Sequence, residues 1–128
     1  DQHRIKRAHS LKMLTAKDVR ERGITEIVQE AMDVAGDGVD AVYLSIDIDV
    51  IDAHESHGTG APEFGGIQTS EFLESMEMLS RYKLLGAVDL CEVAHEWDSS
   101  AQTVRIAASG ILKLLHPWLF DTVEVTES

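Results

Sequence analysis

Three carboxylates follow an apolar, β-branched stretch near the middle of the chain. Residues 41–52 read AVYLSIDIDVID, and the acidic positions are Asp47, Asp49 and Asp52. Side chains alternate across a strand, so Asp47 and Asp49 share one face if the strand extends that far. Neighbouring carboxylates repel each other unless a proton or a cation lies between them. Because hard cations prefer carboxylate oxygens, this spacing predicts a site for Mg²⁺ or Mn²⁺.

A polar, glycine-rich loop follows these acids. Residues 54–66 read HESHGTGAPEFGG. A buried strand that leads into such a loop is where open α/β sheets place their binding sites. The simpler alternative is a solvated strand end followed by an ordinary turn. Three spaced acids together with this loop favour a functional site.

Hydrophobic periodicity and capping residues alternate helices with strands along the chain, which predicts an α/β fold. The expected elements are helices over about 15–22, 24–35, 69–79 and 101–116, and strands over 39–48 and 85–94. The strand over 39–48 is apolar at nearly every position, which predicts cover on both faces. The residues expected at helix ends are Thr15 before Asp18, Gly23, Thr69 or Ser70, and Pro117. The last helix is expected to bury Val104, Ala107, Ala108, Ile111, Leu112 and Leu115, and the tail from Phe120 is weakly strand-like.

Two strands separated by a helix predict a right-handed βαβ unit with parallel strands. The loops after the two strands then leave the same edge of the sheet. This topology predicts that Asp47 and Asp49 lie near Glu92, which follows the second strand. The histidines that would join the same crevice are His54, His57 and His95, although an ordinary surface loop position fits His57 and His95 as well.

Composition limits the kind of protein. The chain has 128 residues, which fits one domain, and a formal charge of −12, which argues against nucleic-acid or anionic membrane partners. Its single cysteine, Cys91, excludes an intrachain disulfide and favours a reducing compartment such as the cytoplasm. A packing role is expected for Cys91, and packing or interface roles are expected for Trp97 and Trp118. No apolar run reaches membrane-spanning length, and no signal peptide is visible.

Three motifs together resemble one known family. Residues 45–52 (SIDIDVID), 58–66 (GTGAPEFGG) and 89–94 (DLCEVA) are similar to the signature of the ureohydrolases, which include arginases, agmatinases and formiminoglutamases. The resemblance covers about residues 11–116 and is nearest to agmatinase. It implies a three-layer α/β/α fold with a mainly parallel sheet. Residues 1–128 would form the C-terminal part of that single domain, so the chain looks cut from something longer.

The resemblance also implies an activity. Ureohydrolases cleave a guanidino or formimino C–N bond with a hydroxide that bridges two Mn²⁺ ions, and they release urea or formamide. Asp47 and Asp49 would then be metal ligands, and Glu92 would bind the substrate guanidinium. Asp52, His57 and His95 would belong to the surrounding loops. The expected partners are a small guanidino substrate, the missing N-terminal half and further copies in a trimer or hexamer.

The sequence departs from the family pattern in ways that limit this expectation. The family takes its other metal ligands and its acid/base histidine from earlier motifs such as His-x-Asp-x-His-x-Asp, which this sequence lacks. His3 and His9 lie in a basic opening segment without matching carboxylates, and Ala53 and His57 stand where the family loop usually has proline. The 128 residues alone are therefore expected to be inactive.

Two alternatives remain open at this point. One is a haloacid-dehalogenase-type phosphatase, in which Asp47 would be the nucleophile and Asp49 the acid/base group. The other is a non-catalytic split or degenerate ureohydrolase half that serves assembly. A His-x-Asp-x-His-x-Asp segment upstream in the gene, or in a partner chain, would favour the enzyme.

Overall fold

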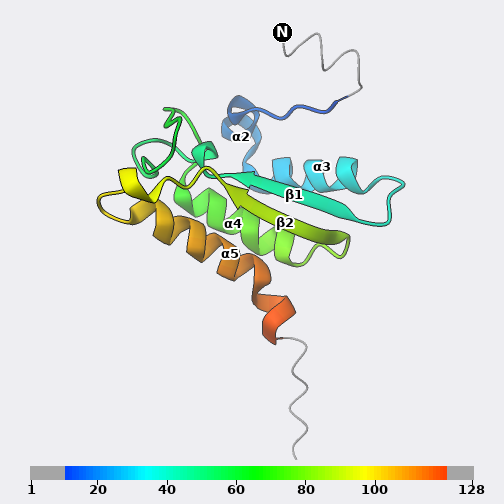
Figure 1. Ribbon diagram of the computed structural model, residues 1–128. Coiled ribbons are helices and arrows are strands. Elements are labelled where there is room, and N and C mark those ends of the chain that lie inside the picture. Colours follow the sequence, from blue (N-terminus) through cyan, green and yellow to red (C-terminus); the bar gives the residue numbers. More distant parts are fainter. Residues whose placement is uncertain (1–10, 121–128) are drawn as a thin grey trace, which may run out of the picture.

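The computed structural model describes residues 11–120. Its helices are α2 (Ala16–Arg22), α3 (Ile24–Gly36), α4 (Thr69–Ser80) and α5 (Gln102–Phe120), and its strands are β1 (Val42–Asp47) and β2 (Leu85–Cys91). Short 3-10 helices follow each strand: η1 (Ile48–Val50) and η2 (His95–Trp97). Helices and strands alternate along the chain (Figure 1), which confirms the α/β prediction.

The two strands pair in parallel. Val42 lies opposite Leu85 at one end of the ladder, and Asp47 lies opposite Cys91 at the other. Because α4 connects β1 to β2, the predicted βαβ unit is confirmed, and both strands end at the same edge of the sheet. That edge is where the candidate site residues gather.

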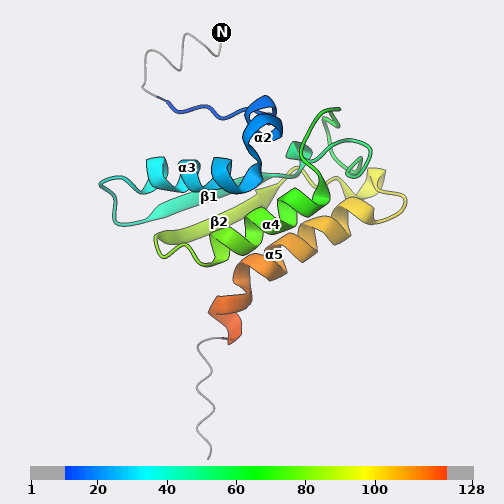
Figure 2. The ribbon, with the colours of Figure 1, turned by 180° about the vertical axis from the view of Figure 1, so that it is seen from behind.

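The helices cover one face of the sheet. Figures 1 and 2 show α3, α4 and α5 on the same side of β1 and β2, with α4 between the other two. Within residues 11–120 the arrangement therefore has two layers, and the other face of the sheet is bare. Tyr43, Ser45 and Asp47 are exposed on that face, whereas Ile46 is buried beneath the helices. The prediction that this strand is covered on both faces is thus wrong for the described residues.

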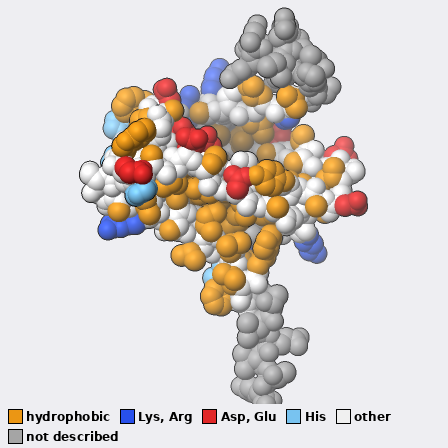
Figure 3. Space-filling view, viewed as in Figure 1, with side chains coloured by type: hydrophobic (Ala, Val, Ile, Leu, Met, Phe, Trp, Pro, Cys, Tyr) orange, Lys and Arg blue, Asp and Glu red, His pale blue; other side chains and the backbone are white. Residues whose placement is uncertain are grey.

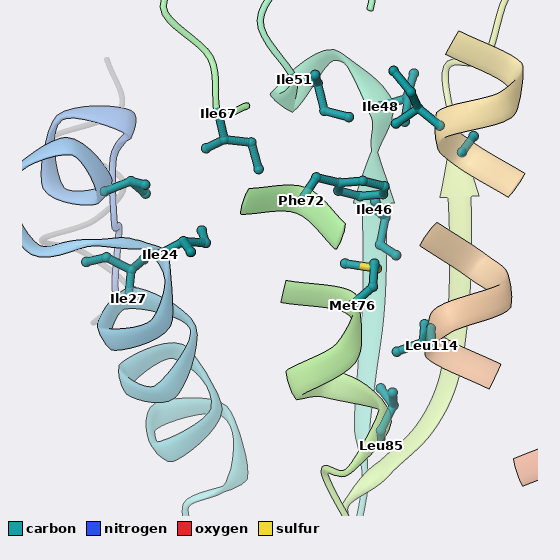
Figure 4. Close-up of a cluster of buried hydrophobic side chains, with 13 residues drawn as sticks. Ile24, Ile27, Ile46, Ile48, Ile51, Ile67, Phe72, Met76, Leu85 and Leu114 are labelled. Carbon is teal, nitrogen blue, oxygen red and sulfur yellow. The ribbon is translucent and has the colours of Figure 1, made fainter. Parts of the chain in front are cut away.

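The hydrophobic core lies between the sheet and its helices (Figure 4). Phe72 of α4 is 1% exposed and occupies the centre. The segments that follow β1 also contribute, because Ile48, Ile51 and Ile67 are all buried. Burial of these three side chains fixes both ends of the glycine-rich loop to the core, so the loop is anchored rather than free.

The face of α5 that packs inward differs from the expected one. The buried residues are Thr103, Ile106, Ala107, Gly110 and Leu114. Ala107 was predicted correctly and Ile111 packs partly buried against the core, but Ala108 and Leu112 are exposed. Apolar side chains surround most of this helix, so periodicity alone does not select the inner face. The selection comes from packing, since only a residue as small as Gly110 fits against the ring of Phe72.

The ends of the elements follow local rules with two exceptions. Thr15 and Asp18 form the predicted capping box at the start of α2. At α4, however, the residue before the helix is Gln68, whose backbone N–H donates to Glu71 at 2.7 Å. Pro117 does not end α5, because a proline near the end of a helix removes only one backbone hydrogen bond.

Two expectations fall outside the described residues: the basic opening segment, and the tail beyond Phe120, which itself ends α5. Among the helices that the structure describes, none combines the length and the apolarity needed to cross a bilayer.

Candidate metal and substrate site

Asp47 and Asp49 lie together at the end of β1, although by a different geometry from the expected one. The strand stops at Asp47, and Asp49 lies in η1. The prediction that Asp47 and Asp49 share one face of a continuous strand is therefore wrong. The carboxylate of Asp47 accepts a hydrogen bond from the backbone N–H of Asp49 at 3.1 Å. This local bond competes with further strand pairing and turns the chain into the 3-10 helix.

The two carboxyl groups interact strongly. The hydrogen-bonding contact with Asp47, then burial, then the negative charge of Asp47 raise the pKa of Asp49 to about 6. Asp49 Oδ1 is buried and has no hydrogen-bond partner among the described residues. A buried acceptor beside a second carboxylate is stabilised by a proton or a cation. The donor set therefore fits a hard divalent ion.

The shell that residues 11–120 supply is only partial. Within this range no group of three or more His, Cys, Asp or Glu side chains is arranged to hold a metal ion. A complete site for Mn²⁺ needs about six oxygen or nitrogen ligands, as octahedral cations do. Asp47 and Asp49 would thus form one side of a metal centre.

Glu92 extends the same edge of the sheet. It follows Cys91, the residue that pairs with Asp47 across the ladder. Its negative charge adds to the rise in the pKa of Asp49, after the larger effects of Asp47 and burial. Its backbone is left-handed, with φ at 64°. Non-glycine residues in this conformation cost about 1–3 kcal/mol and gather at functional sites.

Asp52 organises the loop that follows Asp49. Its carboxylate accepts hydrogen bonds from the backbone N–H groups of His54 at 2.9 Å and Gly65 at 2.7 Å. These two bonds, the first from His54, lower the pKa of Asp52 to about 2. The anion therefore joins the beginning of the loop to its end.

The double glycine at the end of the loop has a packing reason. Gly65 has a φ of 87°, which favours glycine. A Cβ on Gly66 would lie 2.5 Å from the carbonyl oxygen of Val50 and 2.6 Å from the backbone nitrogen of Asp52. Both backbone atoms are held in place by Ile67, whose N–H donates to Val50 O at 3.0 Å and whose carbonyl accepts from Asp52 N–H at 2.9 Å. Gly66 thus allows the returning loop to pair with the segment after η1.

The middle of the loop is fixed to β2 and α5. The carbonyl of Gly58 accepts from Ala94 N–H at 2.8 Å, and Gly58 N–H donates to the buried hydroxyl of Thr103 at 2.9 Å. Thr59 forms an antiparallel bridge with Val93. These contacts place the loop after β1 against the loop after β2, so both borders of the site are held in one position.

The three histidines lie on the exposed rim. Figure 3 shows acidic and histidine side chains over the loops at this end of the molecule. The closest acidic partners of His54, His57 and His95 are respectively Asp52 at 2.8 Å, Asp98 at 4.0 Å and Glu96 at 3.3 Å. In the described part of the chain, none of them hydrogen-bonds or ion-pairs with Asp47, Asp49 or Glu92. Their roles at the site therefore remain predictions.

Comparison with known proteins identifies the family. Residues 1–116 match the model of the arginase family. The chain belongs to the arginase family. It is 35% identical to a formimidoylglutamase of Halalkalibacterium halodurans over 109 residues, which are 84% of this chain and 34% of that protein. It is 39% identical to a Schizosaccharomyces pombe protein named as an agmatinase, over 78% of this chain and 24% of that protein. An arginase structure from Bacillus caldovelox superposes with a TM-score of 0.83 at 26% identity, over 88% of this chain and 38% of that one.

Family membership confirms the resemblance and the arginase-like fold. The chain spans about a quarter to a third of the length of these two curated relatives. Their names differ in substrate, so the agmatinase-like specificity stays a prediction. The motif that would make the chain a phosphatase gains no support from the match.

Cys91 differs from its expected packing role. It is exposed on the bare face of the sheet, and its thiol contacts the carbonyl of Ile46 at 3.5 Å. Trp97 is 62% exposed, so it does not pack into the core of the described residues, and its alternative role at an interface stays a prediction. The prediction from the sequence assumed cover that residues 11–120 do not provide.

No role was predicted for Asp98 from the sequence. In the structure its buried carboxylate accepts hydrogen bonds from the backbone N–H groups of Gln102 at 3.0 Å and Val104 at 2.9 Å. An aspartate just before a predicted helix is a capping signal that could have identified this role.

Proposed function

We propose that the chain supplies one side of a ureohydrolase active site that hydrolyses a guanidino or formimino C–N bond. The observation that carries the proposal is the unpartnered Asp49 oxygen beside Asp47, at the same sheet edge as Glu92. In a chain of the arginase family, this arrangement is best explained by a divalent metal and a cationic substrate. Agmatine is our first choice of substrate, followed by arginine, guanidinobutyrate and formiminoglutamate.

Asp47 and Asp49 would hold the metal, for which Mn²⁺ is the proposed ion, two per complete site. When bound, Mn²⁺ supplies Lewis acidity and lowers the pKa of water. The two carboxylates would offset part of the positive charge of the ions and would hold them at the sheet edge. We propose that the remaining ligands come from outside residues 11–120, in the same protein or in a partner chain.

Glu92 would orient the substrate. A guanidinium is planar, keeps its proton and presents paired N–H groups, so a carboxylate is its natural partner. Glu92 would accept these N–H groups while the backbone, fixed by the pairing of the two loops, keeps the carboxylate in place. In Glu92→Gln the charge-assisted bond is lost, which costs about 1.5–3 kcal/mol.

The test uses the protein expressed from its whole reading frame. Calorimetry measures Mn²⁺ binding. Colorimetric assays measure urea released from agmatine, arginine and guanidinobutyrate, and formamide released from formiminoglutamate. The expected result is that Asp49→Asn loses metal and activity together, whereas Glu92→Gln keeps the metal and weakens substrate binding roughly tenfold to a hundredfold.

Each other outcome has a defined meaning. Failure to bind Mn²⁺ refutes the metal site, and Mn²⁺ binding without turnover of any of the four substrates supports the non-catalytic half. Phosphate release from a phosphomonoester would favour the phosphatase instead. Urea release by the 128 residues alone would contradict a partial site. We also propose that the whole protein forms a trimer or hexamer, which sedimentation of the same preparation would test.

A further inference from the structure

An exposed tryptophan lies beside the proposed substrate carboxylate. Trp97 belongs to η2, and 62% of its surface is accessible. A Cβ built on Gly60 would lie 3.3 Å from Glu92 Oε2 and 4.0 Å from Trp97 Cζ3. The carboxylate and the indole therefore lie next to each other over Gly60, which has no side chain to separate them.

The backbone that carries Trp97 is held on both sides. Trp97 N–H donates to the carbonyl of Ala94 at 3.0 Å, and Ala94 N–H donates to Gly58 at 2.8 Å. The next residue, Asp98, has a fully buried side chain that caps α5. The indole is thus exposed on a fixed segment, which is the arrangement of a binding aromatic rather than of a mobile surface residue.

The surroundings attract cations. Asp47 pairs with Cys91 across the ladder, and Asp89 and Glu92 lie within two residues of Cys91. Asp89 and Glu92, which are not proposed as metal ligands, favour cationic ligands at this end of the sheet. Trp97 adds a feature that charge alone lacks, namely a flat apolar surface.

We propose that Trp97 and Glu92 together recognise the planar cation of the substrate, with the indole stacked on the guanidinium or amidinium plane and the carboxylate bonded to its edge. This inference rests on the proposed function and names the feature of the substrate that the site selects. A guanidinium is weakly hydrated and stacks on aromatic rings, whereas an ammonium is strongly hydrated and has no flat face. Trp97 therefore makes the site prefer planar over tetrahedral cations.

The first test follows Trp97 directly. In a Trp118→Phe background, Trp97 is the sole tryptophan of the chain. The Mn²⁺-loaded protein, expressed from its whole reading frame with any further tryptophan replaced, is titrated with butylguanidinium and with butylammonium while indole emission is recorded. We expect a saturable change with butylguanidinium, weakened by Glu92→Gln, and none with butylammonium over the same range. No saturable change, or equal responses to both cations, would overturn the proposal.

The second test is kinetic. Trp97→Leu should raise KM for the guanidino substrate roughly threefold to thirtyfold, the range of cation–π contacts, with kcat and Mn²⁺ affinity retained. Trp97→Phe should restore most of the affinity, and Trp118→Leu is the matched control that should leave KM unchanged. Gly60→Ala keeps the indole but displaces the Glu92 carboxylate by a few tenths of an ångström, so it should also raise KM.

The two proposals fail in different ways. If Trp97→Leu leaves KM unchanged while urea is still released, the recognition role is wrong and the hydrolase stands. If none of the four substrates is hydrolysed but the emission titration saturates only with butylguanidinium, the hydrolase is wrong and planar-cation recognition stands.

Discussion

Replacing Glu92 by glycine should stabilise the protein while removing substrate recognition. Glu92 is held at a φ of 64°, and Ala101 at 54° is the other non-glycine residue with positive φ among those described. The left-handed conformation costs an L-residue roughly 1–2 kcal/mol, which glycine avoids. Glycine also gains about 0.5–1 kcal/mol of unfolded-state entropy, which offsets part of this relief. The net gain expected for Glu92→Gly is therefore about 0.5–1 kcal/mol.

Ala101→Gly is the matched control, because it relieves the same strain in the turn before α5 without touching the site. Thermal unfolding followed by circular dichroism should show both variants melting about 2–5 °C above the parent. Butylguanidinium binding should be lost in Glu92→Gly and retained in Ala101→Gly. Glu92→Gln, in contrast, should leave the melting temperature unchanged, since it keeps the strained backbone.

One result would refute this reasoning. If Ala101→Gly gains stability and Glu92→Gly loses more than about 1 kcal/mol, the Glu92 side chain contributes to the fold more than its backbone costs. The residue would then be structural, and its unusual conformation would no longer support a functional role. If both variants lose stability, the left-handed conformation is not a source of strain in this protein.

Three further predictions follow from the packing and the charges. Asp49→Asn should lower Mn²⁺ affinity by more than the roughly tenfold to hundredfold that outer-shell changes cause, as calorimetric titration would measure; equal isotherms would exclude Asp49 as a ligand. Gly110→Ala should destabilise the protein by about 1–3 kcal/mol in urea denaturation, because the new methyl group would lie 2.4 Å from Phe72 Cε1. This cost exceeds the gain in helix propensity. The control Ser109→Ala, at an exposed position of the same helix, should be neutral or stabilising. Because the pKa of Asp52 is lowered to about 2, the stabilisation by the Asp52 carboxylate should be complete above its ordinary pKa of 3.8 and lost as pH falls through 2. Asp52→Asn should remove that part of the pH dependence of the unfolding free energy, measured by chemical denaturation in acid. An unchanged acid profile in Asp52→Asn would contradict the prediction.

The sequence predicts the elements well because their signals are local. The Thr15–Asp18 capping box and the glycines that end α2 and α3 are read within a few residues. The parallel topology then brings Glu92 to the edge where β1 ends at Asp47, although Asp47 and Glu92 are far apart in the chain. The features that could not be predicted from the sequence depend on contacts between segments that are distant in the chain. The backbone of Glu92 is set by loop pairing, such as the bond from Ala94 to Gly58, which leaves no local pattern.

The same distinction explains where strain and unpaired groups lie. The loop after β1 satisfies its backbone groups through Asp52 and Thr103 and is anchored in the core by Ile51 and Ile67. Such a rigid frame can keep the raised pKa and unpartnered oxygen of Asp49 in place, since relaxation would disrupt many bonds at once. The ligand that we propose for Asp47 and Asp49 would relieve these unfavourable features. A divalent cation would remove the carboxylate repulsion and the unpaired acceptor together, so Mn²⁺ should raise the melting temperature of the parent protein but not that of Asp49→Asn.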